Sequence, residues 1–399
     1  MSDRRVVVTG LGPVSPLGCG KETFWNAILE GKDGSCNVQR FDTSQYKVHR
    51  ACEVQGYVAP KLPGDPGPAA ALAVEAARLA LEDANFAEIP QQSGVVMGTT
   101  GGEIPILEHI HRQQAEQGED QVPRRQFPKY PCHTITAQVA RYFGLKGPNL
   151  MVPTACAAGN YAFAMAKDWI QEGRCDVVLA GGADPLSIVS FTGFSRLFAI
   201  SPDVPRPFDK NRKGILPGEG AGILVLEAYE SAQKRGAHIY AEMVGYGLSC
   251  DAYHPTMPHP ESMGVRLAME RALADAGLTP ADVDYISAHG TGTQANDKLE
   301  TAAIRAVMQD QAERVPVSSV KSMMGHTMGA ASALEGIVCS MAIQSDMIPP
   351  TIHYETPDPD CDLDYVPNQA RQHPVGVALN NAYAFGGNNS CVVFARHPR

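Results

Sequence analysis

The order of segments in the first half of this chain is repeated in the second half. The stretches RRVVVTGLG (4–12) and YAEMVGYGLSC (240–250) each indicate a strand that runs into a glycine turn. Each is followed by an apolar stretch typical of a helix, at 69–86 and 263–277, and then by a strand with a glycine-rich end, at 93–102 and 283–293. The repeat predicts an α/β fold with two similar halves, 1–239 and 240–399.

Composition excludes several classes of protein. A formal net charge of -10 over 399 residues argues against general nucleic-acid binding, because that requires a basic face. The chain has no uncharged apolar run of membrane-spanning length, and its first residues lack the pattern of a signal peptide. Its ten cysteines include no CxxC pair and no zinc-like spacing. We therefore expect no membrane segment, no metal site and a cytoplasmic location.

Two segments concentrate basic residues. The first contains Arg124, Arg125 and Lys129, and the second contains Arg206, Lys210, Arg212 and Lys213. Such segments suit docking of an acidic protein partner, but they suit solvated loops equally well.

Cys156 lies between an apolar strand-like run, NLMVP, and an alanine-rich stretch that is typical of a helix ending near Gly173. A thiol at a helix N-terminus is a candidate nucleophile, because unpaired N–H groups there lower its pKa. A lone cysteine is more often a buried structural residue.

Two histidines lie in comparable glycine-rich settings. His289 closes the strand-like run VDYISA, and His326 follows KSMMG just before an apolar helix-like stretch. Each histidine, taken alone, is as well explained as a structural residue that packs in the core as by a catalytic role. All three side chains, however, fall at strand ends or helix starts, where α/β folds build their sites.

The motifs TAC (154–156), RPFD and GEGAG (206–222), HGTGTQANDKLE (289–300), KSMMGH (321–326) and AFGGNN (384–389) occur in one order. In that order they resemble the elongating, type II β-ketoacyl-acyl carrier protein synthases, over nearly the whole chain. The resemblance implies a thiolase-like fold, in which the two duplicated halves form five layers, αβαβα. It also implies a homodimer, or a heterodimer with a related chain-length subunit.

The resemblance further implies decarboxylative Claisen condensation in fatty-acid or polyketide synthesis. Cys156 would hold the acyl chain, and malonyl-acyl carrier protein would supply the two-carbon extender. His289 and His326 would donate hydrogen bonds to the developing enolate oxygen. The enzyme would need no cofactor of its own, because phosphopantetheine arrives on the acyl carrier protein.

Other positions take roles by the same resemblance. Lys321 matches a charged residue of the site, and Glu300 matches the acid that commonly pairs with it. Thr291 and Thr293 match residues that bind the phosphopantetheine arm. Phe385 matches a gate residue, flanked by the substrate-facing Ala384 and Gly386, and the N–H groups of Cys156 and Phe385 would hold the acyl carbonyl.

The chain departs from the family pattern at three places. Ala384 replaces the glycine that usually precedes the gate phenylalanine, which predicts a restricted gate, because alanine avoids positive φ. The sequence CAAGN follows the nucleophile instead of the usual serine- or threonine-rich pattern, and Cys132-His133 stands where the acyl pocket meets the partner subunit. These departures favour a specialised substrate.

Two other functions explain fewer of these motifs. One is a non-catalytic chain-length subunit, which the presence of Cys156, His289 and His326 argues against. The other is a Cys-His thioesterase, which leaves the second histidine motif and the gate unexplained.

Overall fold

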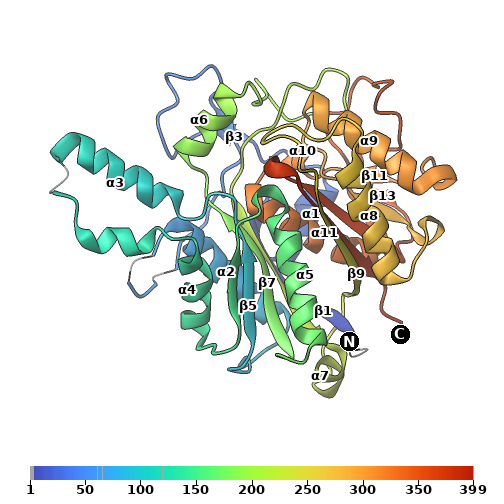
Figure 1. Cartoon of the computed structure of the whole chain (residues 1–399), viewed down its shortest axis with the longest axis horizontal. Helices are drawn as coiled ribbons and strands as arrows, with labels where there is room; N and C mark the ends of the chain where they lie inside the picture. Colours follow the sequence, from blue (N-terminus) through green and yellow to red (C-terminus); the bar gives the residue numbers. More distant parts are fainter. Residues whose placement is uncertain (1–3, 61, 65, 119–120, 399) are drawn as a thin grey trace.

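The computed structural model describes residues 4–60, 62–64, 66–118 and 121–398 (Figure 1). Most of its strands belong to one mixed sheet. The N-terminal half contributes strands in the spatial order β6 (Asn149–Val152), β5 (Gly94–Gly98), β7 (Val177–Asp184), β8 (Gly220–Ala228) and β1 (Val6–Ser15). β6, β5 and β7 are parallel, whereas β8 is antiparallel to both of its neighbours.

The C-terminal half repeats this arrangement. Its strands follow the spatial order β11 (Val317–Ser318), β10 (Tyr285–Ser287), β14 (Val377–Tyr383), β15 (Asn388–Ala395) and β9 (Ala241–Cys250). The first three are parallel, and β15 is antiparallel to β14 and to β9. The two sets join where β1 pairs with β9 through Val7–Glu242 and Val8–Ala241. The predicted duplication is therefore visible in strand order and direction.

Two helices form the middle layer. α5 (Ala158–Gln171) and α11 (Ala331–Ser345) pack against each other and against strands of both halves. Their backbones approach closely, because a Cβ on Gly159 would lie 2.6 Å from the Ala333 nitrogen and one on Gly336 would lie 2.6 Å from the Phe163 ring.

Further helices cover the outer faces of the two sets of strands (Figure 1). α2 (Pro68–Asp83) and α4 (His133–Phe143) cover the N-terminal strands, and α8 (Met263–Ala276) and α9 (Gln294–Met308) cover the C-terminal ones. The predicted αβαβα layering is confirmed.

The halves share a hydrophobic core. Its central cluster contains Phe163 and Trp169 from the first half together with Ile337 and Phe394 from the second. The halves are therefore parts of one packed unit, and the division at 239/240 stays a prediction from the sequence.

The remaining elements connect or extend these layers. They are β2 (Gly18–Cys19), α1 (Lys21–Leu29), β3 (Cys36–Asn37), β4 (Arg50–Ala51), α3 (Ile104–Gln117), α6 (Ile188–Arg196), α7 (Tyr229–Lys234), α10 (Lys321–Met324), β12 (Met347–Ile348) and β13 (Arg371–Gln372). Within the described ranges, no helix has the length and apolar character needed to cross a bilayer.

The two arginines of the second basic segment form ion pairs, whereas its Lys210 and Lys213 are exposed. Arg212 is buried and forms ion pairs with Asp297 and Asp358, and Arg206 pairs with Asp203 and Glu355. These arginines hold the loop to neighbouring segments. Of the two basic segments, only the first keeps exposed arginines, Arg124 and Arg125.

Candidate active site

Cys156 lies in the turn between β6 and α5. The turn is tight, because Ala155 adopts a positive φ of 50° and a short 3-10 segment, Ala155–Ala157, leads directly into the helix. The side chain is buried, with 7% of the residue exposed. The structure thus places the cysteine at the helix entrance, as the sequence predicted.

His326 occupies the matching turn of the second half, after α10 and before α11. Met328, two residues on, has a φ of 55°, and its N–H donates to Nδ1 of His326 at 3.1 Å. Because Nδ1 accepts this bond, the proton of the neutral ring is on Nε2. His326 is therefore fixed as a hydrogen-bond donor through Nε2.

His289 follows β10, and the Glu300 carboxylate holds its backbone. Oε1 of Glu300 accepts the His289 N–H and Oε2 accepts the Gly290 N–H, each at 2.8 Å. The two histidine rings are nearly perpendicular, with centroids 5.6 Å apart. Burial, together with the positive charge of Lys321, holds the pKa of both imidazoles well below its ordinary value. Both rings are neutral at physiological pH.

Glu300→Gln tests this positioning role. Glutamine offers one carbonyl oxygen to two buried N–H groups, so one of them loses its acceptor. We expect kcat to fall by about 10- to 100-fold with little change in KM, and the free energy of unfolding to fall by about 1–3 kcal/mol. Steady-state kinetics and urea titration measure both. The exposed Glu313→Gln serves as a control and should change neither, and unchanged kcat in Glu300→Gln would contradict the role.

The expected pairing of Lys321 with Glu300 is wrong. Lys321 forms its ion pair with Glu335 of α11, and both side chains are fully buried. Burial raises the pKa of Glu335 to about 7, although the Lys321 charge opposes this. Glu300 likewise does not line the site cavity and acts on the backbone of His289.

The expectation of a lowered thiol pKa is also not met. Burial raises the pKa of Cys156 to about 12, even though the Lys321 charge acts in the opposite direction. Desolvation of the thiolate outweighs the favourable charge. The resting nucleophile is therefore a protonated thiol.

This protonation state gives a pH prediction. Below its pKa a thiol gains tenfold in thiolate fraction for each unit of pH, so alkylation of Cys156 by iodoacetamide should accelerate about tenfold per unit from pH 7 to pH 10. Peptide-resolved mass spectrometry separates Cys156 from the exposed Cys250. A plateau below pH 9 would show that the helix N-terminus and Lys321 dominate over burial.

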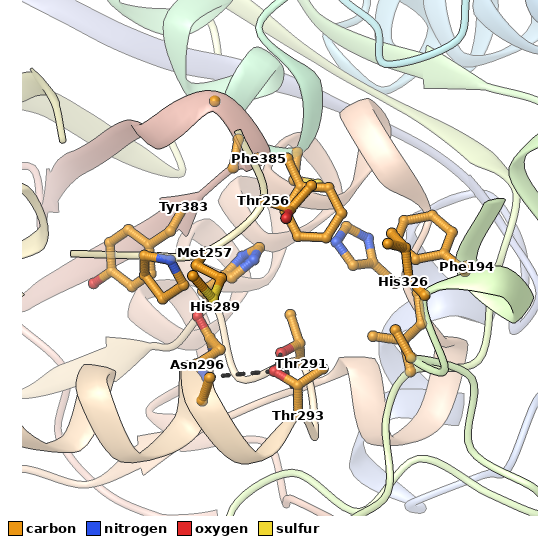
Figure 2. Close-up of a pocket in the computed structure, with 18 of the residues that line it drawn as sticks. Phe194, Thr256, Met257, His289, Thr291, Thr293, Asn296, His326, Tyr383 and Phe385 are labelled. Carbon is orange, nitrogen blue, oxygen red and sulfur yellow. Dashed lines mark hydrogen bonds between the residues drawn. The ribbon is translucent and has the colours of Figure 1, made fainter. Parts of the chain in front are cut away.

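A cavity of about 290 Å³ joins these groups (Figure 2). Among the ten residues proposed from the sequence, eight line it and two, Lys321 and Glu300, do not. The eight are Cys156, His289, Thr291, Thr293, His326, Ala384, Phe385 and Gly386. The sequence motifs therefore meet at one site, although they are far apart along the chain.

Sequence reasoning missed several lining residues. Phe194, Asn296 and Tyr383 face the same cavity. Asn296 and Tyr383 lie inside or beside motifs that the sequence had singled out, and this was the available signal. Phe194 comes from α6, which carries no motif, so only the tertiary fold reveals it.

The gate segment differs from expectation at Ala384. This residue has φ -132° and ψ 154°, an extended conformation that alanine adopts without strain. The positive φ values fall on Gly386 (84°) and Gly387 (78°). Phe385 is 43% exposed, with its ring 6.0 Å from that of Phe194. In this conformation, alanine at 384 imposes no restriction on the gate.

Known proteins match the whole chain. The family model for the β-ketoacyl synthase N-terminal domain matches residues 3–232, and the model for the C-terminal domain matches residues 240–355. A 3-oxoacyl-[acyl-carrier-protein] synthase 2 from Synechocystis is 39% identical, over 100% of this chain and 99% of that protein. The enzyme of the same name from Coxiella burnetii is 40% identical over 99% of each.

Solved structures agree with these sequence matches. The ishigamide ketosynthase/chain length factor aligns with a TM-score of 0.96 and 43% identity, covering 99% of this chain and all of that one. The structure of a type II PKS acyl-carrier protein in complex with its ketosynthase aligns with a TM-score of 0.92 and 35% identity, covering 99% of this chain and all of that one. The chain therefore belongs to the β-ketoacyl synthase family of condensing enzymes.

Proposed function

We propose that this enzyme holds an acyl chain on Cys156 and condenses it with malonyl-acyl carrier protein. One observation carries the proposal: a buried thiol and two neutral imidazoles line the same cavity. One of the imidazoles is fixed as a hydrogen-bond donor. A hydrolase needs one imidazole as a base, whereas decarboxylation needs donors for an enolate oxygen.

The first step loads the enzyme. The Cys156 sulfur attacks the thioester carbonyl of the incoming acyl carrier, and the tetrahedral intermediate collapses with loss of the carrier thiolate. The proton that Cys156 loses balances the one that the carrier thiol gains. Because the resting group is a thiol, the proton leaves Cys156 as the sulfur attacks the carbonyl.

The second step makes the carbon nucleophile. Malonyl carrier loses CO₂, and the electron pair of the broken C–C bond moves into the thioester as an enolate. Nε2–H of His326 donates to the developing oxygen, and His289 supplies the second hydrogen bond. Neutral rings suit this role, because a neutral imidazole can donate its N–H without first gaining or losing a proton.

The third step forms the new bond. The enolate carbon attacks the acyl thioester on Cys156, and the intermediate collapses to release the Cys156 thiolate, which takes up one proton. The product is a β-ketoacyl chain, two carbons longer, on the carrier. The N–H groups of Cys156 and Phe385 would hold the acyl carbonyl during attack, and both residues border the cavity.

The Lys321–Glu335 pair supports these steps from behind the cavity. Its buried positive charge favours the neutral form of both histidines and opposes the rise in the Cys156 pKa. Lys321 thus tunes all three groups.

The carrier protein would deliver the substrate through its phosphopantetheine arm, past Thr291 and Thr293. The condensing enzyme would need no cofactor of its own. Its protein partner would be a second copy of this chain or a related chain-length subunit, and native mass spectrometry of the complex distinguishes the two. All ten cysteines are free thiols, which supports a cytoplasmic location.

The substrate would be specialised, such as an unsaturated or polyketide chain. The departures after Cys156 and at Cys132-His133 support this choice, as does the likeness to a type II PKS ketosynthase. Indifference of acyl loading to chain length and saturation would contradict it.

Mass spectrometry of the intact enzyme after incubation with an acyl carrier protein tests the proposal. We expect a mass increase equal to the acyl group, located on the peptide that contains Cys156. An unmodified Cys156 peptide, or acylation at another cysteine, would overturn it. An unacylated enzyme is also what the non-catalytic chain-length alternative predicts.

A further inference from the structure

Asn296 is a polar residue of the site cavity that the catalytic steps do not use. It lies in the first turn of α9, three residues after Thr293, whose hydroxyl accepts the Asn296 backbone N–H at 3.4 Å. Its side chain lines the cavity together with Thr291 and Thr293 (Figure 2).

Two carboxylates fix the orientation of the Asn296 carboxamide. Its Nδ2 donates to Oδ1 of Asp297 at 3.1 Å and to Oε2 of Glu300 at 3.4 Å. Carboxylate oxygens accept hydrogen bonds, so the NH₂ group must face them and the carbonyl oxygen must face away. Asp297 and Glu300 are themselves held by backbone N–H groups. The carboxamide is therefore anchored at its nitrogen, and Oδ1 is turned toward the cavity.

The neighbouring hydroxyls supply the complementary group. Thr291 and Thr293 share a hydrogen bond at 2.9 Å, which uses one of their two O–H protons and leaves the other available to a ligand. The cavity thus presents a donor and an acceptor side by side among apolar residues such as Met257 and Phe194. This pair is complementary to an amide, which carries one C=O and one N–H.

We propose that Asn296 is a substrate-positioning residue whose Oδ1 accepts an amide N–H of the thioester arm. The inference rests on the proposed function, in which substrates arrive on phosphopantetheine, an arm with two amides. Asn296 binds the arm and not the acyl chain. It should therefore discriminate between thioesters with and without amides, and leave the chemistry at Cys156 unchanged.

The test measures kcat/KM for acylation of Cys156 by octanoyl pantetheine and by octanoyl ethyl thioester, which has no amide. We expect Asn296→Ala to lower the value for the pantetheine thioester by about tenfold and to leave the ethyl thioester unchanged. Gln294→Ala, in the same helical turn but outside the cavity lining, is the matched control and should change neither.

A change in the ligand gives a second test that does not depend on folding of the variant. Two ester analogues of the pantetheine thioester each replace one amide N–H by oxygen. With the unmodified enzyme, one analogue should react about tenfold more slowly than the amide, and with Asn296→Ala the two should react equally. Acylation rates with octanoyl carrier protein and with octanoyl coenzyme A are then compared between the unmodified enzyme and Asn296→Ala. The comparison shows for which source of the arm the reaction depends on Asn296.

The outcomes separate the two proposals. Equal losses for pantetheine and ethyl thioesters would show that Asn296 acts through His289 and would overturn the inference. Full reactivity of both ester analogues with the unmodified enzyme would also overturn it. Failure of every thioester to acylate Cys156 would instead overturn the proposed function, and the inference with it.

Discussion

Cys156→Ala is expected to abolish condensation, with a loss of at least ~10³-fold in product formation. Without the sulfur, no acyl-enzyme forms, and the enolate has no thioester to attack within the cavity. The expected result includes continued slow release of CO₂ from malonyl carrier, because His289 and His326 remain. Chromatography of the carrier-bound products and trapping of CO₂ measure the two reactions separately.

Cys36→Ala is the matched control for this prediction. Cys36 is a partly exposed thiol on β3 and does not line the cavity, so its removal should leave condensation unchanged. Thermal unfolding shows whether each variant is folded. A folded Cys156→Ala enzyme that elongates acyl chains at the normal rate would contradict the assignment.

His326→Ala is expected to give the second large effect, a loss of about 10²- to 10³-fold in the release of CO₂ from malonyl carrier. The variant loses the Nε2–H donor that the Met328 N–H fixes in place. Acylation of Cys156 should fall much less, because that step develops charge on a different oxygen. His289→Ala should show the same pattern.

The comparison of two rates makes this prediction specific. Release of CO₂ is measured by trapping, and acylation is measured by the mass of the Cys156 peptide. His111→Ala, on the exposed side of α3, is the control and should change neither. Equal losses of acylation and decarboxylation in His326→Ala would assign the residue to activation of the thiol instead.

Local patterns in the sequence were sufficient to predict several strands and helices, their repeated order in the two halves, and the positions of Cys156, His289 and His326 at strand ends or helix starts. Glycine turns and the positions of Cys156 and His289 after apolar strands depend on neighbours in the chain, so a single sequence reveals them. The motifs that contain these residues carried the resemblance to the family, and the resemblance implied the layered arrangement. The approach of α5 to α11, by contrast, depends on contacts between Gly159 and Ala333, far apart in the sequence.

The errors in the predicted site have the same cause. Lys321 was paired with Glu300, but the fold brings Glu335 of α11 to it, because that helix runs back through the middle layer. The raised pKa of Cys156 results from burial, and no local pattern shows how much water a site excludes. Ala384 was expected to restrict the gate, yet the backbone places the positive φ two residues further on, at Gly386.

Product analysis of one reaction tests the central claim most directly. Purified enzyme is given octanoyl carrier protein together with malonyl carrier protein labelled with ¹³C in its carboxyl group. We expect a β-ketoacyl chain two carbons longer on the carrier, with one labelled CO₂ released for each chain formed and no label retained. Release of free octanoic acid in place of the longer chain, or retention of the label in the product, would contradict it.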